Sequence, residues 1–165
     1  MIKTQNFTID VFKDDDEDAV IGILANADVK KNYICYDLDY DGLKKKFKQL
    51  KLDSKIKIHY ARAVFKEKEL IAIVNDAHIE KDKVEIEIAV LPDYQKVDVL
   101  SEILEAISDE LLNKKGFAEV VTYCFAGYSQ YKDALDKAGF TKLEKEEDFT
   151  YRGNDVKCLF YSIAQ

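Results

Sequence analysis

Two glutamates, Glu85 and Glu87, are the residues whose type and spacing best suit proton transfer. They alternate with apolar residues in the run from Val84 to Leu91. Alternate side chains of a β-strand share a face, so the two carboxylates lie about 7 Å apart, on the face opposite Val84 and Ile88. A positioned carboxylate can accept a proton from a nucleophile as a general base. A solvated outer face of the strand explains the same pattern, so both interpretations stand.

The cysteines and histidines are not spaced as in catalytic or metal sites. Cys35, Cys124 and Cys158 lie far apart among apolar or aromatic neighbours, which predicts buried, reduced thiols. His59 and His78 fall in strand-like segments, where a packed or hydrogen-bonded ring is more common than a metal ligand. We predict no metal site.

The charge of the chain indicates which partners it suits. The formal net charge is −7, and only two arginines, Arg62 and Arg152, are present. This composition argues against nucleic-acid binding and favours cationic partners. The acidic run at residues 14–18 allows two interpretations: carboxylates in the first turn of a helix, stabilised by the helix dipole, or a lip that attracts an amine substrate.

Length and hydropathy predict a single domain over residues 1–165. A chain of this size buries roughly two-thirds of its unfolded surface without help from disulfides or metals. The first residues lack the apolar core of a secretory signal, and no later apolar run reaches membrane-spanning length. We therefore expect a cytoplasmic protein with no membrane partner.

Periodicity and turn signals predict alternating groups of strands and helices. The expected strands are 6–13, 59–65, 70–79, 84–91, 118–125, 141–150 and 156–163, and the expected helices are 19–29, 42–52, 99–113 and 129–138. Gly139 is placed as the residue that ends the last helix. This order implies an α+β, mixed three-layer arrangement with helices on both faces of a sheet.

The segment from Val84 to Phe140 resembles the acetyl-CoA-binding half of GNAT-type N-acetyltransferases. Its marks are a strand ending in Pro-Asp-Tyr-Gln at 92–95 and a helix ending in Lys-Ala-Gly-Phe at 137–140. The resemblance extends less specifically over nearly the whole chain. It implies a GNAT-like acyl-CoA N-acyltransferase fold with a central, mostly antiparallel sheet flanked by helices, acetyl-CoA as cofactor and a primary amine as acceptor.

The resemblance also implies roles for individual residues. Backbone groups at the end of the strand hold the pantetheine arm and the thioester, and the following loop lays its N–H groups against the pyrophosphate. The cofactor-binding positions are then Val90, Leu91, Gln95, Lys96, Val97, Asp98, Val99, Leu100, Ser101 and Tyr128. The catalytic candidates are Glu85, Glu87 and Tyr131. Tyr131 replaces a tyrosine that many relatives have at the position of Leu135, although an aromatic at this helical spacing is also typical of core.

The loop departs from the family pattern at two positions that usually hold small residues, here Asp98 and Leu100. Leucine obstructs close approach of the backbone, and an aspartate places a negative charge beside an anion. Asp98 also suits an N-cap that accepts bonds from the N–H groups of Leu100 or Ser101, which predicts self-capping in place of pyrophosphate binding. Alternatively, the cap is an ordinary one, the loop shifts to admit the cofactor, and Lys96 offsets the charge.

The sequence is compatible with two functions that belong to different classes. The first is an N-acetyltransferase acting on a protein or peptide α-amine or on a small amine, which we expect to be cationic. The second is a non-catalytic GNAT-fold module that binds a ligand or protein and has lost productive CoA binding. A third, a dimerisation domain, depends on the apolar arm VKCLFYSI at 156–163, which also fits an interior strand. The sequence allows a monomer or a homodimer.

Overall fold

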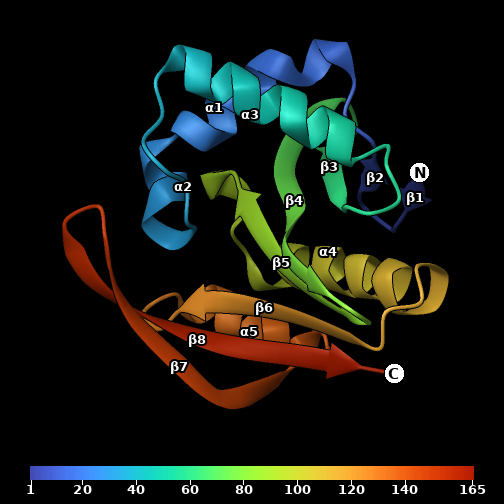
Figure 1. The fold of residues 1–165 in the computed structure, drawn as a ribbon, viewed down its shortest axis with the longest axis vertical. Helices are drawn as coiled ribbons and strands as arrows, with labels where there is room; N and C mark the ends of the chain where they lie inside the picture. Colours follow the sequence, from blue (N-terminus) through green and yellow to red (C-terminus); the bar gives the residue numbers. More distant parts are fainter. The chain divides into compact units, whose positions relative to one another are not determined.

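The computed structural model describes all residues, 1–165, and its contacts divide into two compact units. The first unit comprises residues 1–76 and 88–94, and the second comprises residues 77–87 and 95–165. Figure 1 shows the helices and strands of both units with their labels.

The strands of the first unit form an antiparallel arrangement in the order β1-β2-β3-β4. Their bounds are β1 Ile2–Lys3, β2 Thr8–Asp10, β3 Ala61–Lys66 and β4 Glu69–Glu80, of which residues 77–80 belong to the second unit. Glu67 adopts a positive φ of 55° in the tight turn between β3 and β4. The predicted strands 59–65 and 70–79 thus form an antiparallel hairpin, whereas the predicted strand at 6–13 is shortened to β2.

Three helices complete the first unit: α1 Glu17–Ala25, α2 Ala27–Asn32 and α3 Tyr40–Asp53. The prediction of one helix over 19–29 is wrong, because Asn26 has extended backbone angles, φ −69° and ψ 122°. Its Oδ1 atom accepts hydrogen bonds from the N–H groups of Asp28 and Val29, at 2.9 and 3.0 Å. Such an N-cap ends α1 and begins α2.

The acidic run has a structural role at the start of α1. Residues Asp14–Asp16 form a 3-10 turn that leads into the helix. A carboxylate oxygen of Asp16 accepts a hydrogen bond from the N–H of Lys13 at 2.7 Å. Asp14 forms an ion pair with Lys51 of α3, and the hydrogen bond and charge of Lys51 lower the pKa of Asp14. The run therefore lies at the start of a helix, as predicted, and its role as a lip for an amine substrate stays a prediction.

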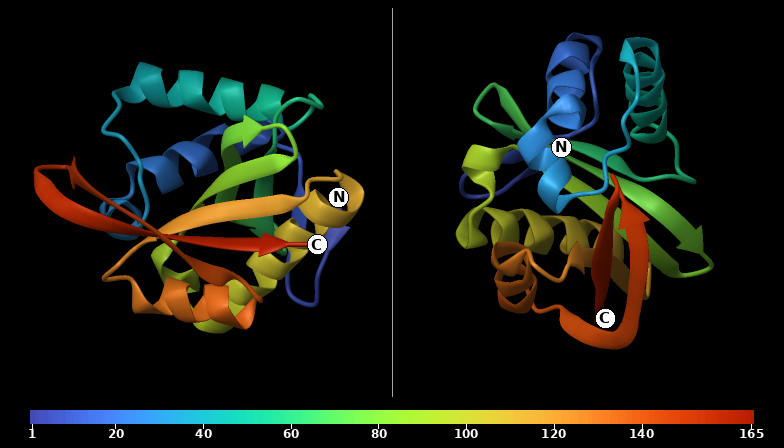
Figure 2. Two further views of the ribbon diagram at one scale, coloured as in Figure 1. Left: turned by 60° about the horizontal axis from the view of Figure 1, so that its bottom comes forward. Right: turned by 90° about the vertical axis from the view of Figure 1, so that its left-hand side faces the viewer.

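The second unit is a sheet with strand order β4-β5-β6-β8-β7, covered on one face by two helices (Figures 1 and 2). The strands are β5 Lys83–Val90, of which residues 88–90 belong to the first unit, β6 Glu119–Phe125, β7 Thr141–Tyr151 and β8 Asn154–Ala164. β5 and β6 pair in parallel, and β8 pairs antiparallel with β6 on one side and β7 on the other. The helices are α4 Val97–Asp109, extended by a π-helical turn at Glu110–Lys114, and α5 Ser129–Lys137. A short 3-10 turn, Pro92–Tyr94, precedes α4 in the chain.

The end of α5 is defined by a glycine, as predicted. Gly139 has φ 87°, its N–H donates to the carbonyl of Asp136, and the N–H of Phe140 donates to the carbonyl of Leu135 at 2.9 Å. These are the two hydrogen bonds of a Schellman motif, which satisfies the last carbonyls of a helix. The chain leaves this motif directly into β7.

The mixture of helices and mostly antiparallel strands confirms the predicted α+β class. The three cysteines are all buried, and none forms a disulfide. No helix has both the length and the apolar character needed to cross a membrane. No group of three or more His, Cys, Asp or Glu side chains converges as a metal-ligand set.

Candidate functional site

The pair Glu85 and Glu87 lies on β5 as the alternation predicts. Val84, Ile86 and Ile88 are buried on the opposite side of the strand, with exposed fractions of 0 to 7%, and both glutamates are half-buried. In the parallel pairing, Glu85 is opposite Val121 of β6. Residues two further along each strand return to the same face, so Glu87 shares its face with Tyr123.

Tyr123 makes a direct contact with one of the two glutamates. Its hydroxyl donates a hydrogen bond to Oε1 of Glu87, with an O–O distance of 3.2 Å. Burial of the ring, and next the nearby Glu87 carboxylate, raise the pKa of Tyr123 far above its usual range. The hydroxyl therefore keeps its proton at neutral pH and acts as the donor. The neighbour of Glu85 on β6 is Val121, which has no hydrogen-bonding group, so this contact distinguishes Glu87 from Glu85.

Sequence reasoning missed Tyr123. The only signal was a single tyrosine in the apolar strand VVTYCF, at residues 120–125. Its pairing with Glu87 depends on the register between two parallel strands that are separated by all of α4. Periodicity identifies such strands but does not fix which of their residues are opposite one another.

Tyr131 lies in the interior, on the other face of the sheet from Glu87. Only 1% of its surface is exposed. The hydroxyl of Thr122 donates to the carbonyl of Ile86 at 3.1 Å, so its hydrogen bond to the Tyr131 hydroxyl, at 3.2 Å, is one that Thr122 accepts. Burial raises the pKa of Tyr131. The two hydrogen bonds of Thr122 thus link Tyr131 of α5 through β6 to Ile86 of β5. The role of Tyr131 as a leaving-group acid stays a prediction.

The start of α4 differs from the self-capping prediction. The N-cap is Lys96, in extended conformation, and no side chain caps the helix. Asp98 lies two positions beyond the N-cap, too far into the helix to cap it. Its carboxylate is 2.6 Å from Nζ of Lys137 in α5, and the hydrogen bond and charge of Lys137 lower the pKa of Asp98. The hypothesis that Asp98 occupies the N–H groups of its own helix is therefore wrong in this structure.

Leu100 and Ser101 also point inward. We expected Leu100 to obstruct approach to the start of the helix. Its side chain is instead fully buried in the interior. Ser101 is 2% exposed, and its hydroxyl donates to the carbonyl of Asp98 at 3.1 Å. Both side chains thus belong to the core of the second unit. The end of α4 presents mainly backbone N–H groups and the Asp98–Lys137 ion pair.

The other predicted cofactor positions have various environments. The N–H of Leu91 donates to the carbonyl of Ile71 at 2.9 Å, within the first unit, and the side chain of Val90 is fully buried. Lys96 is exposed, and Gln95, Val97 and Val99 are half-buried. Tyr128 is 3% exposed, and its ring centre is 5.7 Å from that of Tyr131. Their binding roles stay predictions.

The thiols of Cys124 and Cys158 are unsuited to nucleophilic catalysis. Burial raises the pKa of the Cys124 and Cys158 thiols to about 12, so neither provides a reactive thiolate at neutral pH.

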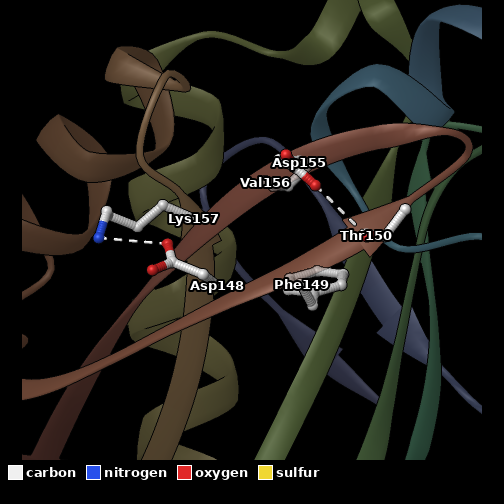
Figure 3. Close-up of a pocket in the computed structure, with 6 residues that line it drawn as sticks. All are labelled: Asp148, Phe149, Thr150, Asp155, Val156 and Lys157. Carbon is white, nitrogen blue, oxygen red and sulfur yellow. Dashed lines mark hydrogen bonds and ion pairs between the residues drawn. The ribbon is translucent and has the colours of Figure 1, made fainter.

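A shallow hollow lies near the turn between β7 and β8 (Figure 3). It is lined by Asp148, Phe149, Thr150, Asp155, Val156 and Lys157. Neighbouring residues of a strand point to opposite faces, so these six side chains do not converge on one enclosed space. Asp148 and Lys157 form an ion pair at 3.2 Å, and Thr150 donates to Asp155 at 3.4 Å. The hollow is a feature of a twisted hairpin, and we assign no site to it.

No protein-family model and no curated protein sequence matches the chain. Solved structures match over nearly its full length. An acetyltransferase of the GNAT family from Bacillus anthracis is 17% identical, with a TM-score of 0.81, and the match covers 99% of this chain and 97% of that one. The ribosomal-protein-S5-alanine acetyltransferase from Vibrio fischeri is 13% identical, with a TM-score of 0.82 and coverage of 99% and 95%.

A third match is the spermidine N-acetyltransferase from Vibrio cholerae, solved in complex with CoA and spermine. It is 15% identical, with a TM-score of 0.81, and the match covers 98% of this chain and 97% of that one. Identities this low establish shared architecture and leave activity to be argued from the residues themselves. The chain therefore has the fold of GNAT-family acetyltransferases, as the resemblance of its sequence predicted.

Proposed function

We propose that this protein is an N-acetyltransferase that uses acetyl-CoA and acts on a primary amine. The observation that carries the proposal is the start of α4, where no side chain caps the helix. The first N–H groups of a helix lack partners within it and, together with the helix dipole, favour an anion. In the family that the sequence resembles, this position receives the cofactor's pyrophosphate.

Asp98 is compatible with such an anion because of its partner. An unpaired carboxylate in the first turn would repel a phosphate, but the Lys137 ammonium lies 2.6 Å from it and offsets its charge. Lys96, exposed at the N-cap, adds a second cation. The loop has therefore lost the small residues of the family pattern while keeping available N–H groups and a balanced local charge.

Glu87 is the proton acceptor that we propose, and Tyr123 is the residue that positions it. When bound, acetyl-CoA supplies the thioester that an amine attacks. Glu87 takes the amine proton, while the hydrogen bond that the Tyr123 hydroxyl donates to Oε1 orients the carboxylate. Glu85, which lacks such a neighbour, has an electrostatic role. A thiol's ordinary pKa of about 8.5 makes a dedicated donor for the leaving group unnecessary, so the proposal does not depend on Tyr131.

The acceptor that we propose is a cationic amine, either a protein or peptide α-amine or a small amine. The net charge of −7 favours approach of such molecules. Two of the similar structures are named for the acetylation of a ribosomal protein and of spermidine, which supports the amine class without deciding between these kinds. We propose a cytoplasmic protein.

The proposal is tested first by cofactor binding. At about a hundredfold excess over its dissociation constant, acetyl-CoA should stabilise the fold by about 2.7 kcal/mol and raise the thermal midpoint by several degrees. Thiol release is then followed with a panel of amines. Glu87→Gln should remove most turnover without changing acetyl-CoA binding, whereas the matched variant Glu85→Gln on the same strand face should retain more.

A non-catalytic module is the second candidate, favoured by one observation. The N–H of Leu91, which the resemblance implies as a thioester donor, is already bonded to the carbonyl of Ile71. Stabilisation by acetyl-CoA without thiol release from any amine would support this module. Absence of any stabilisation would refute the proposed cofactor site at α4.

A further inference from the structure

Seven lysines lie on helix α3 and in the turn that follows it. Residues 44–58 contain these seven lysines and a single acidic residue, Asp53, although the whole chain has a formal net charge of −7. The charge of the chain is therefore unevenly distributed, with a strongly positive segment inside the first unit. A basic segment on an amphipathic helix is attracted to anionic surfaces.

The outward face of α3 combines lysines with an exposed leucine. The inward face packs in the core through Leu43, Phe47 and Leu50. At 3.6 residues per turn, residues spaced by three and four share a face of a helix. The face opposite to the buried one is formed by four residues at this spacing, all of them exposed: Lys45, Lys48, Gln49 and Leu52.

The turn after α3 adds two lysines and an isoleucine. Figure 1 shows how the chain passes through this turn from α3 into β3. The N–H of Lys55 donates to the carbonyl of Leu52 at 2.9 Å, so the turn continues directly from the helix. Lys55 and Lys57 are exposed, and Leu52 and Ile58 are 53 and 73% exposed. The name lysine face is used below for six residues: Lys45, Lys48, Leu52, Lys55, Lys57 and Ile58.

The four ammonium groups of the lysine face form no ion pair within the protein, whereas other lysines of α3 have partners. Nζ of Lys44 lies 4.7 Å from the ring centre of Tyr40, and Lys51 forms an ion pair with Asp14. Unpaired ammonium groups on one face remain available to an external anion.

Two carboxylates close to the lysine face already have partners. Asp14 begins the acidic run, and its pKa is lowered by the hydrogen bond and charge of Lys51 and, more weakly, by the charge of Lys55. Asp53 is half-buried, and its Oδ1 atom accepts a hydrogen bond from the side-chain amide of Gln49 at 2.6 Å. Both contacts reduce the repulsion that these carboxylates exert on an anion at the lysine face.

The side chains of the lysine face favour a lipid surface over a nucleic acid. The face has no arginine and no aromatic ring, so it lacks the bidentate phosphate ligand and the stacking groups that nucleic-acid sites use. Leu52 and Ile58 find no apolar partner on a phosphate backbone, but aliphatic side chains enter the boundary between lipid headgroups and acyl chains. The outer side of a helix is also a convex ridge, which fits a flat surface.

We propose that the lysine face docks the protein on the anionic surface of a lipid bilayer. The four ammonium groups bind the anionic headgroups, and Leu52 and Ile58 insert between them. Each lysine close to such a surface strengthens binding roughly fivefold. The expectation of no membrane partner came from hydropathy, which detects spanning segments and does not detect peripheral binding of this kind. The proposal does not depend on acetyl-CoA or on acetyl transfer.

The test is co-sedimentation of the full chain with phosphatidylcholine vesicles that either contain or lack phosphatidylserine, in the absence of acetyl-CoA. The wild type should bind the vesicles with phosphatidylserine at least about tenfold more tightly than those without, and added salt should release it. Lys45→Gln/Lys48→Gln should weaken binding about tenfold or more. The matched control is Lys68→Gln/Lys115→Gln, which removes two exposed lysines elsewhere with the same change in net charge and should bind as the wild type does.

A second variant pair separates a bilayer from other anions. Leu52→Ser/Ile58→Ser should weaken vesicle binding several-fold while all lysines remain, because the inserted apolar groups are lost. Circular dichroism and thermal midpoints verify that every variant is folded, which is expected because all the substituted side chains are exposed.

Three results would overturn the proposal. The first is no binding of the wild type to phosphatidylserine vesicles at low salt, and the second is an equal loss of binding in the two lysine variants. The third is binding to a single-stranded oligonucleotide that Lys45→Gln/Lys48→Gln loses and Leu52→Ser/Ile58→Ser keeps, with vesicle binding that is weaker in the wild type. That result would assign the lysine face to a nucleic acid.

Discussion

Asp98 and Lys137 form an ion pair at the start of α4, and this pair gives a residue-scale prediction for cofactor binding. Lys137→Met leaves the carboxylate unpaired beside the proposed pyrophosphate and should weaken acetyl-CoA binding about two- to fivefold. Adding Asp98→Asn to that variant should restore affinity, because the repelling charge is then absent. Isothermal titration calorimetry on the wild type, both single variants and the double variant measures this. Equal affinity in all four would place the phosphates elsewhere.

Tyr123 and Glu87 give a second residue-scale prediction. If Tyr123 acts by holding Glu87, then Tyr123→Phe should lower kcat by about tenfold and leave KM for acetyl-CoA unchanged. In a Glu87→Gln background the same substitution should cost little more, since its target is already gone. With Glu85→Gln, by contrast, the two effects should multiply. An equal loss in all backgrounds would indicate a general structural role for Tyr123.

His59 predicts how stability depends on pH. Its Nδ1 atom lies 3.0 Å from Oδ2 of Asp76, and this hydrogen bond raises the pKa of His59 above its usual value of about 6.5. A raised pKa in the folded state means that the contribution is complete below about pH 6.5 and is lost as pH rises through the folded value. His59→Gln should therefore destabilise the protein more at acidic than at alkaline pH. The effect should be small because the ring is 42% exposed. Urea denaturation at several pH values measures it, and a loss independent of pH would exclude the charged pair.

At the scale of elements, the junction of α1 and α2 depends on Asn26. Its side chain satisfies two N–H groups at the start of α2. Asn26→Ala should therefore lower the free energy of unfolding by about 1 kcal/mol, whereas Asn26→Asp should preserve most of the stability, because aspartate caps equally well. Denaturant midpoints compare the two. A neutral alanine variant would mean that packing alone separates the helices.

The elements also show what sequence patterns can and cannot predict. The strands, the long helices and the end of α5 at Gly139 were predicted because each depends on local periodicity or on one residue's backbone freedom. The break at Asn26 was missed, since the apolar spacing continues through it. The predicted N-cap, Asp98, lies two residues after the observed one, Lys96. The carboxylate of Asp98 instead binds Lys137, which is distant in sequence.

At the scale of the whole molecule, the fold was predictable because the order of its elements and two sequence marks agreed. The candidate site was only half predictable. Glu87 could be chosen by type and alternation, but its partner Tyr123 follows from the parallel pairing of β5 and β6, which no local pattern encodes. Likewise, the inward direction of Leu100 depends on how α4 packs within its unit. Features that depend on long-range register had to come from the structure.

The position of β8 between β6 and β7 has a consequence for how the protein is made. A ribosome releases β6 first, then β7, and β8 only after both, yet β8 fills the space between them. Until it emerges, β6 is paired only with β5 and β7 has no strand partner, and the open edges that result invite pairing with other nascent chains. The order of synthesis thus makes the last strand the one that closes the second unit.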